Sequence, residues 1–146
     1  MVHGLEEIHR LLKPDASLVD IHPIPIAPLI EVYQGGRLVF AEPVPAYDDE
    51  DERAAEDALA RVLQRRLFVV EREAAFDFLT YGSSVAQLRD FLVEQSAFAG
   101  NGESVRKWEV ERAEFARRVD EIMRAAGEGA EVAFHERGRI ARLRRI

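Results

Sequence analysis

The stretch Leu5–Pro23 constrains the fold more than any other part of the sequence, because it predicts a helix, a turn and a strand in direct succession. Leucine and isoleucine recur at helical spacing in its first half, and Pro14 follows where a helix can no longer continue. The apolar residues after the turn fit a buried strand, which we place at Ser17–His22. Closely spaced prolines then predict an extended connector that runs to Pro28.

The rest of the chain predicts a mixture of strands and helices. Gly35 and Gly36 separate two apolar runs, which predicts a hairpin at Leu29–Ala41 with positive φ angles in its turn. Further along we expect a helix that begins at the acidic run Asp48–Glu52, followed by one long strand or two short strands over Leu67–Tyr81. Two more helices are expected, one capped by Ser84 and Gln87 and one over Ser104–Ala126. The last expected element is a strand within Ala130–Ile146 that bulges at Gly138. These elements predict an α/β fold, with α+β as the alternative, in a single domain over residues 1–146.

Composition limits the classes of partner. A chain of 146 residues that is 47% hydrophobic is long enough for one domain with a substantial core. Its formal charge of -7 argues against binding to nucleic acid or to an anionic membrane surface. The absence of cysteine excludes disulfides and thiolate metal sites, and no apolar run approaches the roughly 18 residues that a membrane span needs. We therefore expect a soluble, cytoplasmic protein with neither nucleic acid nor membrane among its partners.

The opening block resembles a segment of the class I S-adenosylmethionine-dependent methyltransferases. In that family a helix ending in R-x-L-K-P-G-G leads into the fifth strand of the sheet. This sequence has Arg10-Leu11-Leu12-Lys13-Pro14, followed by Asp15-Ala16 where the family usually has two glycines. The later elements, ending with the strand around Glu136–Arg145, are similar in order to the C-terminal half of the family. The resemblance implies a partial Rossmann-like sheet of about five strands, including an antiparallel hairpin, packed by about four helices.

The same resemblance bears on cofactors and function. It places the glycine-rich cofactor loop upstream of residue 1, and no Gly-x-Gly-x-x-Gly occurs in the sequence. We therefore expect no cofactor bound by this chain alone, and S-adenosylmethionine only if a partner chain supplies the missing half. Three functions follow from this interpretation: a non-catalytic accessory or interaction protein, one half of a split methyltransferase, or a small-molecule binding module. Whether the chain takes part in catalysis stays open at this point.

Asp20 and His22 are the best candidates for catalytic residues. They lie two apart near the end of a strand that the resemblance places in the centre of the sheet, so their side chains share one face. Open α/β sheets usually place ligands at such strand ends, and a carboxylate beside an imidazole can move protons. The alternative is structural, with His22 closing the strand and Asp20 accepting a loop hydrogen bond. His135 and Glu136 are adjacent in a predicted strand, so their side chains point to opposite faces and we expect no catalytic dyad there. We also expect no metal site.

The C-terminal arginines and the large aromatic residues do not point to a nucleic-acid site or a ligand site. Five arginines lie between Arg137 and Arg145, but the chain is acidic and aromatic residues do not alternate with them, so we expect acidic partners or solvent. Large aromatic residues are expected to anchor the core or an interface, and these are Tyr33, Tyr47, Tyr81 and Trp108.

Assembly is the most specific expectation. If the strand Ser17–His22 lacks the neighbour that the methyltransferase fold provides, one side of it has unpaired backbone groups. Only Asp20 carries charge between Ser17 and Ile21, so little protects that edge. We expect the edge to pair with a second copy around a two-fold axis, or with a heteromeric partner. The alternative is that the hairpin Leu29–Ala41 folds back and occupies the vacant place.

Overall fold

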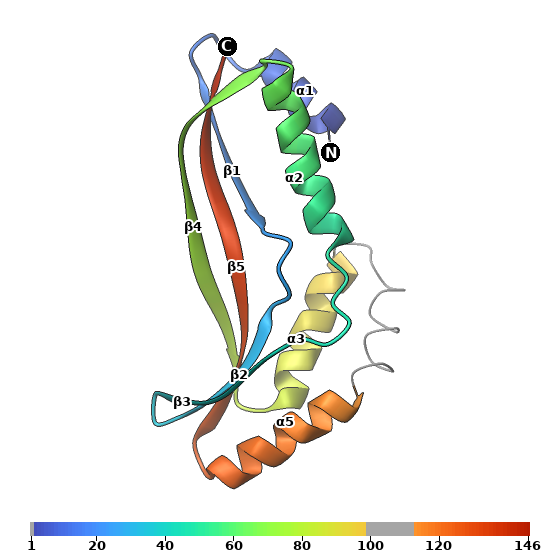
Figure 1. Ribbon diagram of the computed structural model, residues 1–146, viewed down its shortest axis with the longest axis vertical. Helices are drawn as coiled ribbons and strands as arrows, with labels where there is room; N and C mark the ends of the chain where they lie inside the picture. The colour runs from blue at the N-terminus through green and yellow to red at the C-terminus, as the bar shows by residue number, and fades with distance from the viewer. Residues whose placement is uncertain (1, 99–112) are drawn as a thin grey trace. The chain divides into compact units, whose positions relative to one another are not determined.

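The computed structural model describes residues 2–98 and 113–146 of the chain (Figure 1). The helices are α1 (Val2–Leu11), α2 (Glu50–Gln64), α3 (Val85–Phe98) and α5 (Ala113–Ala126). The strands are β1 (Ser17–Pro23), β2 (Leu29–Gln34), β3 (Arg37–Pro43), β4 (Phe68–Gly82) and β5 (Ala130–Arg145). No helix in these ranges is long and apolar enough to cross a membrane.

The chain forms two compact units. Unit 1 comprises Met1–Ile26, Asp48–Phe78 and Arg137–Ile146, so it contains α1, β1, α2, most of β4 and the end of β5. Unit 2 comprises Ala27–Tyr47 and Leu79–Glu136, so it contains the hairpin of β2 and β3, helices α3 and α5, and the start of β5.

The sheet corrects the expected Rossmann-like arrangement. The five strands form an antiparallel sheet in which β5 pairs with β1, with β2 and with β4, and β3 pairs with β2. Pairing of β1 with β5 is antiparallel from Ser17 opposite Arg144 to Pro23 opposite Gly138. A mixed α/β fold is confirmed, but the antiparallel pairing does not support a Rossmann-like sheet. β1 is also not a central strand, because β5 is its one partner among the described strands.

In unit 1, helices α1 and α2 cover one face of the sheet. The acidic first turn of α2, Glu50–Glu52, and Arg61 in its last turn complement the helix dipole, as the sequence predicts. The fully buried side chains of this core are Leu59, Val62, Phe68, Ala141 and Leu143. Leu18 of β1 packs against the same cluster. Figure 1 shows α2 lying along β1. Exposure alternates along β1 from Leu18 to Pro23, and Leu18, Asp20 and His22 are the less exposed residues of this stretch.

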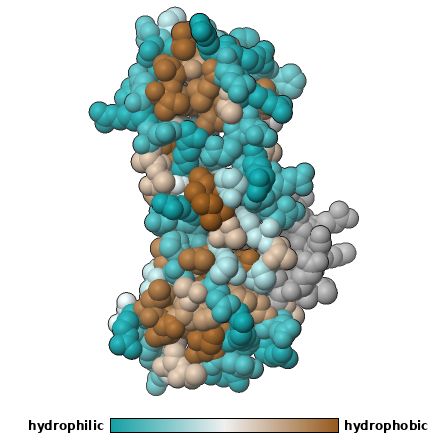
Figure 2. All heavy atoms as spheres, viewed as in Figure 1, coloured by the Kyte–Doolittle hydropathy of each residue, from teal (hydrophilic) through white to brown (hydrophobic). Residues whose placement is uncertain are grey.

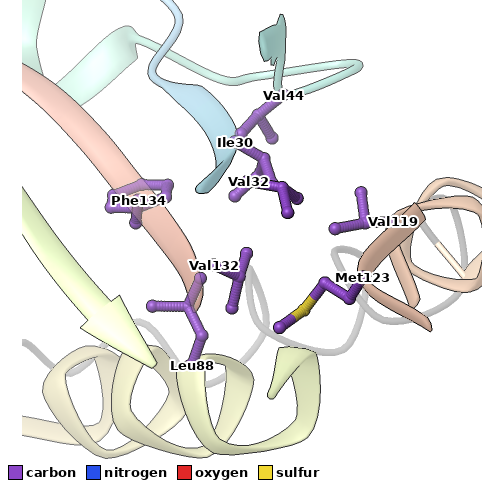
Figure 3. Close-up of a cluster of buried hydrophobic side chains, with 8 residues drawn as sticks. All are labelled: Ile30, Val32, Val44, Leu88, Val119, Met123, Val132 and Phe134. Carbon is purple, nitrogen blue, oxygen red and sulfur yellow. The ribbon is translucent and has the colours of Figure 1, made fainter. Parts of the chain in front are cut away.

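Unit 2 has a separate core between its strands and its two helices. Val119 and Met123 of α5 face the side chains of β2 and β5, and Leu88 approaches from α3 (Figure 3). The cluster also includes Ile30, Val32, Val44, Val132 and Phe134. Val32 and Val132 are opposite each other in the β2–β5 register, so one cross-strand pair lies in the middle of the core.

Most local predictions are confirmed. Gly35 and Gly36 have φ angles of 56° and 76°, which a two-residue hairpin turn of this type requires. Ser84 Oγ accepts a hydrogen bond from the backbone N–H of Gln87 at 3.1 Å, so the predicted helix cap is present. Asp15 has a φ of 62°, a conformation in which aspartate is tolerated. The predicted turn before β1 therefore forms with an aspartate in the left-handed position.

The outcomes of three further predictions differ. Of the two alternatives for Leu67–Tyr81, the single long strand is confirmed, as β4. The described part of the predicted helix Ser104–Ala126 begins at Ala113, and residues 104–112, with Trp108, lie outside the described residues. Pairing of β5 with β1 runs from Gly138 to Arg144 without a register shift, and the bulge expected at Gly138, where this pairing ends, stays a prediction. Gly138 lies under the ring of Phe76, whose nearest carbon is 2.7 Å from where a β-carbon would be.

Candidate functional site

Asp20 and His22, the two residues singled out from the sequence, lie together on the face of β1 that α2 covers. His22 Nδ1 is 2.6 Å from Oδ2 of Asp20, and His22 Nε2 is 3.1 Å from Oε1 of Glu56 on α2. The His22 side chain is only 11% exposed. Strand periodicity places residues two apart on one face, so the sequence predicted correctly that Asp20 and His22 share a face. Their catalytic role stays a prediction.

Arg139 extends this contact into a network across unit 1. It lies opposite His22 in the β1–β5 register. Its Nη1 donates to Oε2 of Glu56 at 3.0 Å, and its Nη2 donates to Oε2 of Glu73 on β4 at 2.5 Å. We call Asp20, His22, Glu56, Glu73 and Arg139 the His22 network. It joins β1, α2, β4 and β5 by polar contacts at one end of the apolar core.

Carboxylate oxygens surround the two basic side chains of the network. Burial alone lowers the pKa of Arg139, but its hydrogen bond to Glu73 and the charges of Glu56 and Glu73 outweigh burial and raise that pKa above the ordinary value. Both ring nitrogens of His22 face carboxylate oxygens. A neutral imidazole has one donor and one acceptor nitrogen, so only the imidazolium form donates to Asp20 and Glu56 together.

This geometry suits a structural cross-link better than proton transfer to a substrate. A general base needs a ring nitrogen within reach of the substrate, and both nitrogens of His22 are already bound to side chains of the same unit. The part of the chain that the structure describes contains no group of three or more metal-ligating side chains arranged to hold an ion. The expected position of Asp20 and His22 at the end of a central strand is wrong, because β5 is the one partner of β1 among the described strands.

A second polar cluster, in unit 2, was missed by the sequence analysis. Glu31 is 4% exposed, and it lies between the buried Ile30 and Val32 on β2. The hydroxyl of Tyr33 donates to its Oε2 at 2.6 Å, and Nδ1 of His135 on β5 lies 2.8 Å from its Oε1. The available signal was a charged residue inside an apolar strand. Such a residue is rarely buried without partners.

Tyr33 gives a direct spectroscopic test of this cluster. Its hydrogen bond to Glu31, followed by burial and the charge of Glu31, raises the pKa of Tyr33 from 10.0 to about 12. Because the neutral phenol is the form stabilised by folding, this contribution to stability is complete below about pH 10 and is lost as the pH rises through 12. We expect Tyr33→Phe to remove the last tyrosine step from an absorbance titration at alkaline pH.

Tyr81 provides the control for that titration, because its ring lies 5.9 Å from the ring of Tyr33. Tyr81→Phe should leave the last step in place. A last step that survives Tyr33→Phe would contradict the hydrogen bond to Glu31.

Comparison with known proteins adds no further constraint: no protein-family model matches the chain, and neither a curated protein nor a solved structure matches it.

Proposed function

We propose that this chain is a non-catalytic interaction protein that assembles through the free edge of β1, with a second copy of itself as the partner. The proposal rests on the observation that β1 has a partner strand along one side. β1 pairs with β5 along one side, and none of the other described strands lies along its second side. The alternative in which the hairpin fills that place is wrong, because β2 pairs with β3 and β5.

The hydrogen-bond pattern identifies which backbone groups the edge offers. The N–H of Ile24 donates to the carbonyl of Arg137, and the N–H of Arg145 donates to the carbonyl of Ala16. In an antiparallel ladder, bonded pairs alternate with non-bonded pairs. The even-numbered residues of β1 therefore turn their backbone groups toward β5, whereas Val19 and Ile21 turn theirs toward the free edge.

The side chains at this edge also favour association. Val19 and Ile21 point away from α2, and they are 56% and 61% exposed. Ile140, opposite Ile21 on β5, is 36% exposed and extends the apolar surface. Figure 2 shows that apolar side chains remain at the molecular surface among hydrophilic ones. An edge with free N–H groups and exposed aliphatic side chains is a template for a further strand.

Charge selects one register for two copies of β1. If Val19 faced Ile21 of the partner subunit, the two Asp20 carboxylates would be directly opposite each other, which is unfavourable. A shift that places Ile21 opposite Ile21 of the partner subunit instead puts Asp20 opposite His22 of the partner subunit. That register provides about four backbone hydrogen bonds, because Ile21 exchanges a pair with its copy and Val19 donates to a Pro23 carbonyl on each side.

Light scattering during size-exclusion chromatography tests the assembly. At micromolar concentration the protein should elute with about twice its mass of 16.6 kDa. The double variant Val19→Lys, Ile21→Lys should be a monomer, because the two ammonium groups at position 21 would lie directly opposite each other across the two-fold axis, and like charges so placed are destabilising. Val39→Lys is the matched control on strand β3, where Val39 is 44% exposed, and it should leave the dimer intact. A monomeric unmodified protein would overturn the proposal.

Single cysteines test the register without background, because the chain has no cysteine of its own. Ile21→Cys places the two sulfur atoms at the two-fold axis, where the Cα atoms are about 5.5 Å apart and can form a disulfide. Val19→Cys in the same register leaves Cα atoms about 13 Å apart, which is too far. Oxidation should therefore cross-link only the Ile21→Cys variant. Cross-linking of Val19→Cys instead would show a different register.

A further inference from the structure

Unit 2 contains an apolar cavity that the proposed assembly does not use. Its volume is about 130 Å³, and it lies between the strands and helices α3 and α5. The main apolar lining residues are Ile30, Leu88, Leu92, Phe115, Val119 and Val132. Figure 3 shows Leu88, Val119 and Val132 from three different elements directed toward the same interior region. The cavity therefore has walls from both the sheet and the helices.

We propose that unit 2 binds a small apolar molecule, about the size of one aromatic ring, in this cavity. A cavity of about 150 Å³ lined by leucine, isoleucine and phenylalanine excludes water and accepts benzene in another protein. The cavity here is of similar size and has the same kinds of side chain. Aliphatic and aromatic walls of this kind are typical of ligand sites in which shape and burial provide most of the affinity.

The charged lining residues define what the site excludes. Among the described residues that line the cavity, only Arg89 and Asp120 are charged, and both are exposed. The Arg89 guanidinium is already paired with Asp90, with Nη2 at 3.1 Å from Oδ1. A polar molecule of the same shape would lose its hydration without gaining buried hydrogen bonds, so it should bind more weakly than a hydrocarbon.

Titration of the full chain with toluene and with pyridine tests the site. These two molecules have nearly the same shape and differ in polarity. We expect saturable chemical-shift changes in unit 2 with toluene, at a dissociation constant of about 1 mM or tighter. Thermal unfolding should shift upward with toluene concentration, because the ligand binds the folded state. Pyridine should bind at least about tenfold more weakly.

Filling the cavity provides the structural control. Ala116→Leu adds a larger side chain to the cavity wall from α5 and should weaken toluene binding at least about tenfold. Ala125→Leu is the same change at an exposed position of the same helix, outside this lining, and should leave binding unchanged. If Ala116→Leu does not fold, Val85→Phe on α3 makes the same test from the opposite wall.

Three results would overturn the site. The first is the absence of a saturable response of the unmodified protein to toluene. The second is equal affinity for toluene and pyridine. The third is toluene binding that survives whichever filling variant folds. None of these results bears on the dimer, because β1 belongs to unit 1 and the cavity residues belong to unit 2.

Discussion

Arg139→Met should lower the free energy of unfolding by about 2 to 3 kcal/mol, because it removes the cation from a partly buried network of carboxylates. The Arg139 side chain is 22% exposed and holds both Glu56 and Glu73. When Arg139 is replaced, Glu56 still has His22 as a hydrogen-bond partner. Glu73 loses its hydrogen bond to Arg139 and with it this contact between β4 and β5. Methionine preserves most of the aliphatic stem, so the loss reports charge and hydrogen bonding more than packing. Chemical denaturation measures it.

Arg142→Met is the matched control on the same strand. Arg142 faces away from α2, its side chain is 58% exposed, and its Nε lies 3.1 Å from Oε2 of Glu71. An exposed ion pair of this kind contributes little, so we expect a cost of about 0.5 kcal/mol or less. Equal costs for the two variants would refute a structural role for the His22 network. His22→Ala, expected to cost about 2 kcal/mol, probes the same network from β1.

Gly138→Ala should destabilise the protein by about 1 to 2 kcal/mol, although alanine is normally the better strand residue. The added β-carbon would lie 2.7 Å from Cζ and 3.0 Å from Cε1 of Phe76, so the aromatic ring must move. In a Phe76→Ala background the obstacle is gone. The same substitution should then stabilise by about 0.5 kcal/mol, because alanine loses less backbone entropy than glycine on folding.

The reversal of sign is the decisive result, and a double-mutant cycle measures it. Gly4→Ala in α1 is the control, because no atom lies within 4 Å of the added β-carbon. It should stabilise the protein by about 0.5 to 1 kcal/mol. If Gly138→Ala costs the same with and without the Phe76 ring, then the glycine is needed for another reason.

The sequence predicted what depends on near neighbours along the chain. The hairpin turn follows from Gly35-Gly36, and the shared face of Asp20 and His22 follows from strand periodicity. The pairing of strands could not be predicted in the same way. Nothing in Ser17–His22 specifies β5 as its partner, because that choice depends on a segment more than a hundred residues later.

The rest of the candidate site could not be predicted either, because its residues are far apart in the sequence. Glu56, Glu73 and Arg139 come from three separate elements, and no spacing pattern relates them to His22. Glu31 is different, because its place between two buried residues in an apolar strand was visible. A search for charged residues inside apolar strands would have found Glu31. Its hydrogen-bond partners, Tyr33 and His135, could then have been sought among the nearby polar side chains.

The nesting of unit 2 inside unit 1 along the chain has a consequence for the order of folding. All of unit 2 lies between residues 27 and 136, whereas β1 of unit 1 gains its partner strand only from residues 138–144. The hairpin of β2 and β3 is local, and the pairing of β1 with β5 closes a loop of more than a hundred residues, so we expect unit 2 to fold first. In that interval both edges of β1 are unpaired. Partly folded chains then meet through the same strand that we propose as the dimer contact, so a high protein concentration during refolding should favour association.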